Sequence, residues 1–206
     1  SSDVCSSDLE IGRLDHEQIQ RVEYLKETVR LGSGLDENRT LSKAAMEKGW
    51  HCLARFSERL QGILPGQVRA VATQTLREAK NRNAFLTEAE GALGHPIEVI
   101  SGREEARLIY AGVHFMHPAE EPKLVLDIGG RSTECVIGSG SKVGPAESFA
   151  VGSQSLTQRY FPDGKLSAAA FRAAQIAAGA EFEEAEKIFS AGRWDQVLAS
   201  SGTAGA

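Results

Sequence analysis

The residues best suited to chemistry are residues 127–134, which read DIGGRSTE. Two glycines, Gly129 and Gly130, allow backbone amides to approach an anion closely, and successive amides form an anion-binding nest. The hydroxyl residues Ser132 and Thr133 add further donors. The segment predicts a phosphate-binding loop, although a plain β-hairpin with a glycine turn has the same pattern.

Two carboxylates flank this loop, Asp127 before the glycines and Glu134 after the hydroxyl residues. Carboxylate oxygens are hard ligands suited to Mg²⁺, which normally keeps several waters and bridges to phosphate. The loop has neither the GK[ST] of a Walker motif nor a Rossmann GxGxxG, so both of those loop types are disfavoured. We therefore expect Mg²⁺ as the cofactor, with Asp127 and Glu134 as its ligands.

A second candidate is residues 101–105, SGREE, which follow an apolar run and open an expected helix. Glu104 and Glu105 fall in the first helical turn, where the helix dipole stabilises charged carboxylates. An ionised glutamate there could orient and deprotonate a water for attack on phosphorus. The alternative is two ordinary helix-favouring acids.

Two further segments could help to bind an anion. Residues 201–205, SGTAG, follow an apolar run, and Gly202 and Thr203 could offer amide and hydroxyl donors. Residues 77–82, REAKNR, begin at Arg77 and are rich in cationic side chains. The alternatives are a simple turn for the first segment and a solvated helix face for the second.

Composition excludes several classes of protein. The chain has 206 residues and a formal net charge of −5, which argues against non-specific nucleic-acid binding. No apolar run approaches the roughly 20 residues of a membrane helix, so we expect no stable membrane insertion. Cys5, Cys52 and Cys135 form no CxxC pair, which disfavours a zinc site or disulfide framework and makes a reducing cytoplasm the expected location.

The elements that must position these residues alternate along the first half of the chain. Ser42 is a good N-cap for a helix to about residue 61, with an apolar stripe at Met46, Trp50, Leu53, Phe56 and Leu60. Strands are expected within residues 18–31, 68–72 and 97–100, and helices before Gly94 and over residues 104–113. Strand and helix in alternation indicate an α/β layer architecture.

The second half follows a polar break at residues 118–122. Strands over residues 124–128 and 134–137 predict a hairpin around the glycine loop. A further strand is expected at residues 147–151, a long Ala-rich helix capped by Ser167 to about residue 189, and a strand at residues 197–199.

Taken together, the segments resemble the exopolyphosphatase and guanosine-pentaphosphate phosphohydrolase family over roughly residues 19–206. The resemblance is carried by VRLGSGLDENRTLS, VRAVATQTLREAKNRNAFL, LGHPIEVISGREEARLIYAGV, LVLDIGGRSTECVIG, RYFPDGKLS and SSGTAGA. The combination of SGxEEARLIY with a following DIGGxSTE is highly specific to this family.

The resemblance implies an α/β fold that is actin-like and sugar-kinase-like (ribonuclease H-like), with two subdomains and a cleft between them. We expect residues 1–9 to be a disordered or foreign tail, residues 10–120 the first subdomain, and residues 121–206 the second. The family's opening strand and DxGSNS phosphate loop have no counterpart here, and the chain stops at the third glycine loop. Both observations predict a fragment whose fold is incomplete at each end.

The resemblance also implies Mg²⁺-dependent hydrolysis of a terminal phosphoanhydride. The main expectation is an exopolyphosphatase that releases orthophosphate from inorganic polyphosphate. The first alternative is a phosphohydrolase of guanosine-5'-triphosphate,3'-diphosphate (pppGpp), and the second is a non-catalytic phosphate- or nucleotide-binding fragment. A sugar or acetate kinase shares the fold, but the EEAR segment argues against it. For the full-length protein we expect a homodimer.

The family pattern assigns roles to particular residues. Glu105 falls on the catalytic base, and Glu134 lies near the metal and the attacking water. The third loop glycine of the family is Arg131 here, which either crowds a phosphate or adds a cation to it. The implied phosphate-binding residues are Arg77, Asp127, Gly129, Gly130, Arg131, Ser132, Thr133, Gly202 and Thr203.

Overall fold

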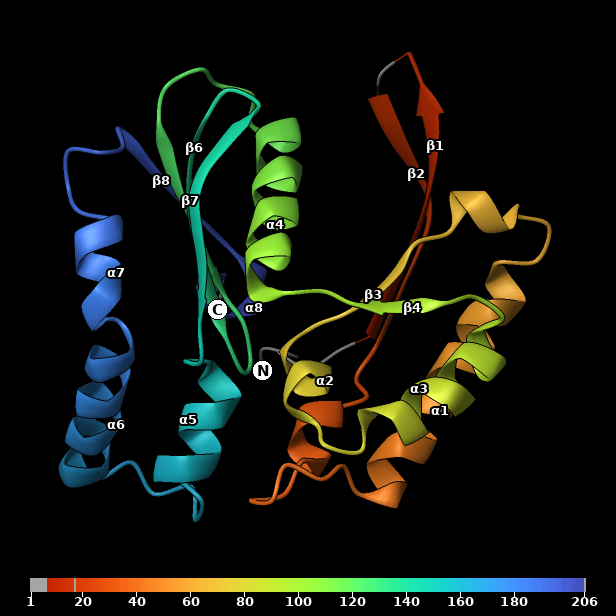
Figure 1. The fold of residues 1–206 in the computed structure, drawn as a ribbon, viewed down its shortest axis with the longest axis horizontal. Helices are drawn as coiled ribbons and strands as arrows, with labels where there is room; N and C mark the ends of the chain where they lie inside the picture. The colour runs from red at the N-terminus through yellow and green to blue at the C-terminus, as the bar shows by residue number, and fades with distance from the viewer. Residues whose placement is uncertain (1–6, 17, 206) are drawn as a thin grey trace. The chain divides into compact units, whose positions relative to one another are not determined.

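The computed structural model describes residues 7–16 and 18–205 (Figure 1). The chain divides into two compact units, with Val99 the last residue of the N-terminal unit and Ile100 the first residue of the C-terminal unit that follows it. Each unit has its own hydrophobic cores. Within the described residues, no helix has the length and apolar character needed to cross a membrane.

The described residues of the N-terminal unit form two small sheets and three α-helices, together with two short 3-10 helices. Strands β1 and β2 pair antiparallel, and β3 and β4 pair parallel. The elements are β1 (Ser7–Asp15), β2 (Gln18–Glu27), α1 (Lys43–Arg59), β3 (Ala70–Ala72), α2 (Gln74–Glu78), α3 (Arg82–Leu93) and β4 (Ile97–Val99).

Helix α1 confirms the predicted cap and its buried stripe. The Ser42 hydroxyl accepts a hydrogen bond from the backbone amide of Ala45 at 3.3 Å, so one of the helix's unpaired first amides is satisfied. Phe56 is buried and packs in one of the unit's cores. Trp50 is half-buried; its indole stacks on Phe85 at 6.1 Å and donates to the Phe85 carbonyl at 3.0 Å. Trp50 is therefore part of the core.

Where the structure describes it, the C-terminal unit is built on a four-stranded sheet in the order β7-β6-β5-β8. Strands β5 and β6 form the predicted antiparallel hairpin, β6 pairs antiparallel with β7, and β5 pairs parallel with β8. The elements are α4 (Gly102–Met116), β5 (Lys123–Ile128), β6 (Thr133–Ser139), β7 (Lys142–Phe149), α5 (Ser153–Tyr160), α6 (Ala168–Glu181), α7 (Glu183–Ile188), β8 (Gln196–Ser200) and α8 (Ser201–Ala204).

Helices cover both faces of this sheet, which gives the unit three layers. Figure 1 shows α4 on one face and α6 with α7 on the other. Because successive side chains of a strand point to opposite faces, alternate residues of each strand enter different cores. The core beneath α4 contains Ala106, Tyr110, Val125 and Val136, and the opposite core contains Leu124, Cys135, Ile137, Phe149 and Phe189.

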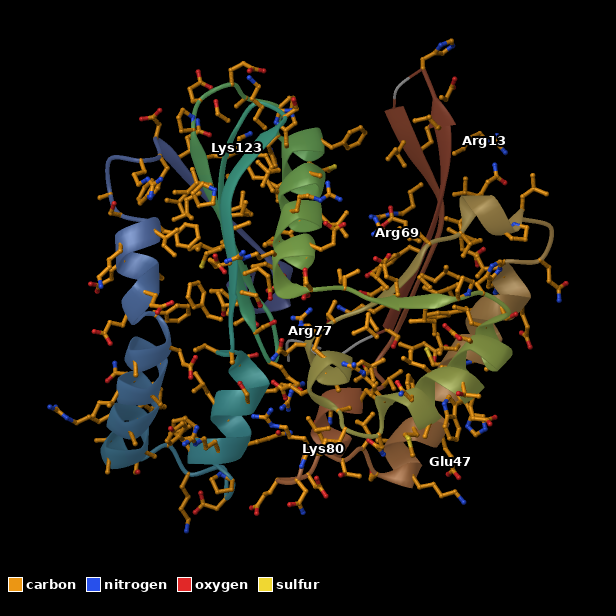
Figure 2. All side chains as sticks on the ribbon, viewed as in Figure 1. Arg13, Glu47, Arg69, Arg77, Lys80 and Lys123 are labelled. Atoms are coloured by element: carbon orange, nitrogen blue, oxygen red, sulfur yellow. The ribbon has the colours of Figure 1, made fainter. Side chains whose placement is uncertain are left out.

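The far end of α4 is fixed to the start of β5 by Lys123 (Figure 2). This side chain is completely buried, and its ammonium donates at 2.9 Å to the carbonyl of His117, the C-cap residue that follows α4. Cations near the C-terminus of a helix complement its dipole, so the contact stabilises α4 where it meets the sheet.

Three sequence predictions about boundaries are wrong. Residues 7–9 belong to β1 and are therefore not a disordered tail, while residues 1–6 lie outside the described residues. The units divide before Ile100 and not at residue 120, because α4 packs on β5 and β6. The expected single helix after Ser167 is two helices, α6 and α7, which meet at Phe182.

Candidate active site

One rung of the C-terminal sheet carries a polar side chain on all four strands. The register aligns Asp127 of β5 with Glu134 of β6 on one side and with Ser200 of β8 on the other. Glu134 in turn aligns with Ser148 of β7. The rung two residues earlier is apolar and packs against α4, and it consists of Leu198, Val125, Val136 and Ala146. The polar rung therefore lies on the same face, where that apolar core ends.

Each carboxylate of this rung is hydrogen-bonded by the serine beside it. The Ser148 hydroxyl donates to Glu134 Oε1 at 2.7 Å, and the Ser200 hydroxyl donates to Asp127 Oδ1. The two carboxylates are direct cross-strand neighbours, and the serines hold them from the outside. The order across the sheet is serine, aspartate, glutamate, serine.

The first turn of α4 brings Glu105 to this rung. A Cβ at Gly102 would lie 2.3 Å from the Cβ of Ser148, so α4 can begin at this point only because residue 102 is glycine. Ser101 caps the helix by accepting from the Glu104 amide at 3.2 Å. Glu105 is close enough that its charge contributes to the pKa of Glu134.

Burial dominates the electrostatics of the rung. Glu134 is only 1% exposed, and burial followed by the charge of Glu105 raises its pKa to about 7. Hydrogen bonds from Ser148 and Ser132 act in the opposite direction. Burial also raises the pKa of Asp127, against a hydrogen bond from Ser200.

Neither Asp127 nor Glu134 forms an ion pair within the described part of the chain. Buried carboxylates that lack a cation are expensive, and a divalent ion is one way to neutralise them. No group of three or more His, Cys, Asp or Glu among these residues could hold a metal alone. The pair fits Mg²⁺, which is commonly held by one or two carboxylates together with substrate phosphates and water.

The glycine turn is held against the start of α5 by its carbonyl groups. The Gly129 carbonyl accepts from the Ser153 amide at 3.0 Å, and the Gly130 carbonyl accepts from the amides of Gln154 and Ser155 at 2.8 and 3.0 Å. Carbonyl oxygens repel an anion, so engaging them with the helix amides suits a loop that binds phosphate. The Gly129 amide closes the turn by donating to the Ser132 carbonyl at 2.9 Å.

Gly152, just before α5, fits tightly against this turn. A Cβ at that position would lie 2.3 Å from the backbone nitrogen of Arg131 and 2.4 Å from the carbonyl carbon of Gly130. Only a residue without a side chain permits this approach of two backbones. Sequence reasoning missed both Gly152 and α5.

The two hydroxyl residues of the loop have partners inside the unit. Thr133 Oγ1 donates to the Val151 carbonyl at 2.6 Å, and Ser132 lowers the pKa of the Glu134 carboxyl. Both residues are buried. The structure thus uses them to shape the loop and the rung, and their predicted role as phosphate donors stays a prediction.

The segment with Gly202 and Thr203 lies beside the glycine turn. The Thr203 hydroxyl donates to Ser153 Oγ at 3.4 Å, and Ser153 Oγ lies 3.4 Å from the Gly129 carbonyl. The parallel pairing of β5 and β8 accounts for this, because the carboxyl ends of parallel strands meet at one edge of a sheet. The structure thus brings two of the predicted loops together.

The two arginines of the prediction lie in different units. Arg131 is part of the glycine turn in the C-terminal unit. Arg77 lies on α2 of the N-terminal unit (Figure 2), where its guanidinium donates to Gln74 Oε1 at 2.7 and 2.9 Å. Their roles in phosphate binding stay predictions.

Comparison with known proteins identifies relatives of this chain. The pattern of the Ppx/GppA phosphatase family matches residues 11–206. The guanosine-5'-triphosphate,3'-diphosphate pyrophosphatases of Aeromonas hydrophila and Aeromonas salmonicida are each 45% identical to this chain over 185 residues, which is 90% of its length. The chain spans 37% of the length of each.

Solved structures with the same fold include several members of this group. An exopolyphosphatase-like protein is 29% identical, with a TM-score of 0.89 over 97% of this chain and 64% of its own. An exopolyphosphatase from Cytophaga hutchinsonii is 25% identical with a TM-score of 0.88 over the same shares. A PilM-PilN complex, 13% identical with a TM-score of 0.55 over 97% of this chain and 80% of its own, shares the fold only. The predicted α/β, actin-like fold is confirmed, and the chain belongs to the Ppx/GppA phosphatase family.

Proposed function

We propose that the complete protein hydrolyses the terminal phosphoanhydride bond of pppGpp and releases orthophosphate. The observation that carries this proposal is the rung in which Asp127 and Glu134 lie side by side with Glu105 close to Glu134. Such a group can position a water and a phosphoryl group together. The choice of pppGpp is supported by the names of the two Aeromonas relatives.

Glu105 is the residue that we assign as general base. It orients the attacking water and accepts its proton as the water oxygen bonds to the terminal phosphorus and the bridging P–O bond breaks. The capped first turn of α4 favours the ionised form of this carboxylate, which a base requires. Catalysis of phosphoryl transfer is mostly positioning and charge stabilisation, and a helix packed on a sheet is a rigid support for it.

Asp127 and Glu134 are the residues that would hold Mg²⁺. When bound, this ion would neutralise negative charge on the terminal phosphoryl oxygens. The same two carboxylates would then be ionised, because a cation beside them lowers the pKa that burial has raised. The glycine turn and the neighbouring segment with Gly202 and Thr203 would contact the phosphate oxygens.

Inorganic polyphosphate is the second candidate substrate. It is the main expectation from the sequence, and it is supported by the solved exopolyphosphatase at 25% identity and the exopolyphosphatase-like protein at 29% identity. The 45% identity to the Aeromonas pyrophosphatases supports pppGpp more strongly. Both substrates end in the same phosphoanhydride, so the carboxylate rung serves either one.

A direct competition distinguishes the candidates. Orthophosphate release by the complete protein would be measured with Mg²⁺ and each substrate alone, and then with the other added as a competitor. We expect a higher kcat/KM for pppGpp. Faster release from polyphosphate would favour the second candidate, and binding of both without release would favour a non-catalytic phosphate-binding protein.

A further inference from the structure

Ser148 contacts both of the elements that carry the catalytic glutamates. Its hydroxyl donates to Glu134 Oε1 at 2.7 Å. Its Cβ lies under Gly102, the first residue of α4, where a substituted Cβ would come within 2.3 Å. The Ser148 side chain therefore hydrogen-bonds a carboxylate of β6 and also packs against the first turn of α4, which carries Glu105.

The residue before Ser148 strengthens this attachment. Glu147 accepts two hydrogen bonds from the Arg103 guanidinium, Nη2 to Oε1 at 2.7 Å and Nε to Oε2 at 3.2 Å. Because β7 is the edge strand of the sheet, a helix residue can reach around it. Two successive residues of β7 thus hold the first turn of α4 against the rung.

We propose that Ser148 is a positioning residue that fixes the Glu134 carboxylate relative to the α4 turn carrying Glu105. The inference rests on the proposed function, since Glu134 and Glu105 are the groups assigned to the reaction. Neither composition nor motif spacing indicates Ser148, because its partners lie on another strand and on a helix. Only the strand register brings it to the site.

Ser148→Ala tests the hydroxyl while keeping the Cβ that packs under Gly102. Loss of a group that orients a metal-site carboxylate typically costs about 10- to 100-fold in activity, and we expect kcat to fall by that factor with little change in KM. Ser139→Ala is the matched control, because Ser139 also lies on this sheet and its hydroxyl donates to the Glu120 carbonyl at 2.6 Å. That variant should keep the wild-type kcat.

Gly102→Ala tests the second contact, because the new Cβ must displace either Ser148 or the start of α4. We expect a comparable loss of kcat. A wild-type kcat in Gly102→Ala or in Ser148→Ala would overturn the proposal.

A double-mutant cycle in unfolding gives a readout that does not need turnover. The free energy of unfolding would be measured for the complete protein, Ser148→Ala, Glu134→Ala and the double variant. The two changes should be non-additive, because the hydroxyl acts through that carboxylate; additive effects would contradict the inference. If the wild-type protein releases no phosphate while the cycle shows coupling, the proposed function fails and the contact stands. If turnover is normal and Ser148→Ala matches Ser139→Ala, the inference fails and the function stands.

Discussion

Asp127 and Glu134 lie directly opposite each other on antiparallel strands β5 and β6. Both carboxylates have a pKa above its usual value, chiefly because they are buried. The two carboxylates lie at one end of the sheet, beside the glycine turn that joins β5 to β6.

The pKa of Glu134 predicts a pH-dependent stability in the absence of metal. It stands at about 7 in the folded protein, against 4.5 for the free side chain. Between these values the folded chain holds more protons than the unfolded chain, so the free energy of unfolding should fall as pH rises through this window. At roughly 1.4 kcal/mol for each pKa unit, the loss should be about 3 kcal/mol.

Urea unfolding with a chelator present, across this pH range, would measure that loss. Glu134→Gln cannot ionise and should lack most of the decline. Glu181→Gln, an exposed position on α6, should behave as the wild type does. Parallel pH curves for the wild type and Glu134→Gln would show that the buried carboxylate does not titrate as described.

Asp127→Asn tests the proposed role of Asp127 as a metal ligand. Replacing one of two charged oxygen ligands by a neutral amide should raise the half-saturating Mg²⁺ concentration, and a tenfold increase corresponds to about 1.4 kcal/mol. The measurement is the rate of phosphate release against Mg²⁺ concentration. Asp195→Asn, at an exposed site just before β8, is the control. An unchanged Mg²⁺ curve for Asp127→Asn would remove this residue from the metal site.

Gly152→Ala tests the close packing of Gly152 against the glycine turn. The added Cβ would meet backbone atoms of Gly130 and Arg131 at 2.3–2.4 Å, and backbone cannot turn aside as a flexible side chain can. We expect a loss of about 1–3 kcal/mol in stability, as for other overpacked sites, and a large fall in kcat/KM. Gly179→Ala on α6 meets no atom within 4 Å and should be neutral or slightly stabilising. Equal kcat/KM for the two variants would contradict the account of the turn.

Local signals in the sequence predicted much of this fold. Ser42 and Ser167 cap helices as expected, and Gly94 ends α3 in the left-handed conformation with φ of 76°. The glycine pair at Gly129 and Gly130 marked the β5–β6 hairpin correctly. These features depend on residues a few positions apart, and for that reason sequence alone is sufficient to find them.

The features that could not be predicted depend on packing between residues far apart in the sequence. Helix α4 belongs to the C-terminal unit because Ala106 and Tyr110 fill a core with Val125 and Val136, and nothing near α4 in the sequence shows that choice. Ser148 is a site residue only through the strand register. The two carboxylates can be predicted from their residue types. The serines that hydrogen-bond them can be identified only from the pairing of the strands.

Replacement of Glu105 by glutamine in the complete protein tests the central claim most directly. Orthophosphate release from pppGpp would be followed with Mg²⁺ present, and the unfolding midpoint would be measured beside it. Loss of a general base typically costs about 10²–10⁴ in rate, so Glu105→Gln should be slower by that factor with an unchanged unfolding midpoint. A wild-type rate in this variant would contradict the assignment of Glu105 as the base.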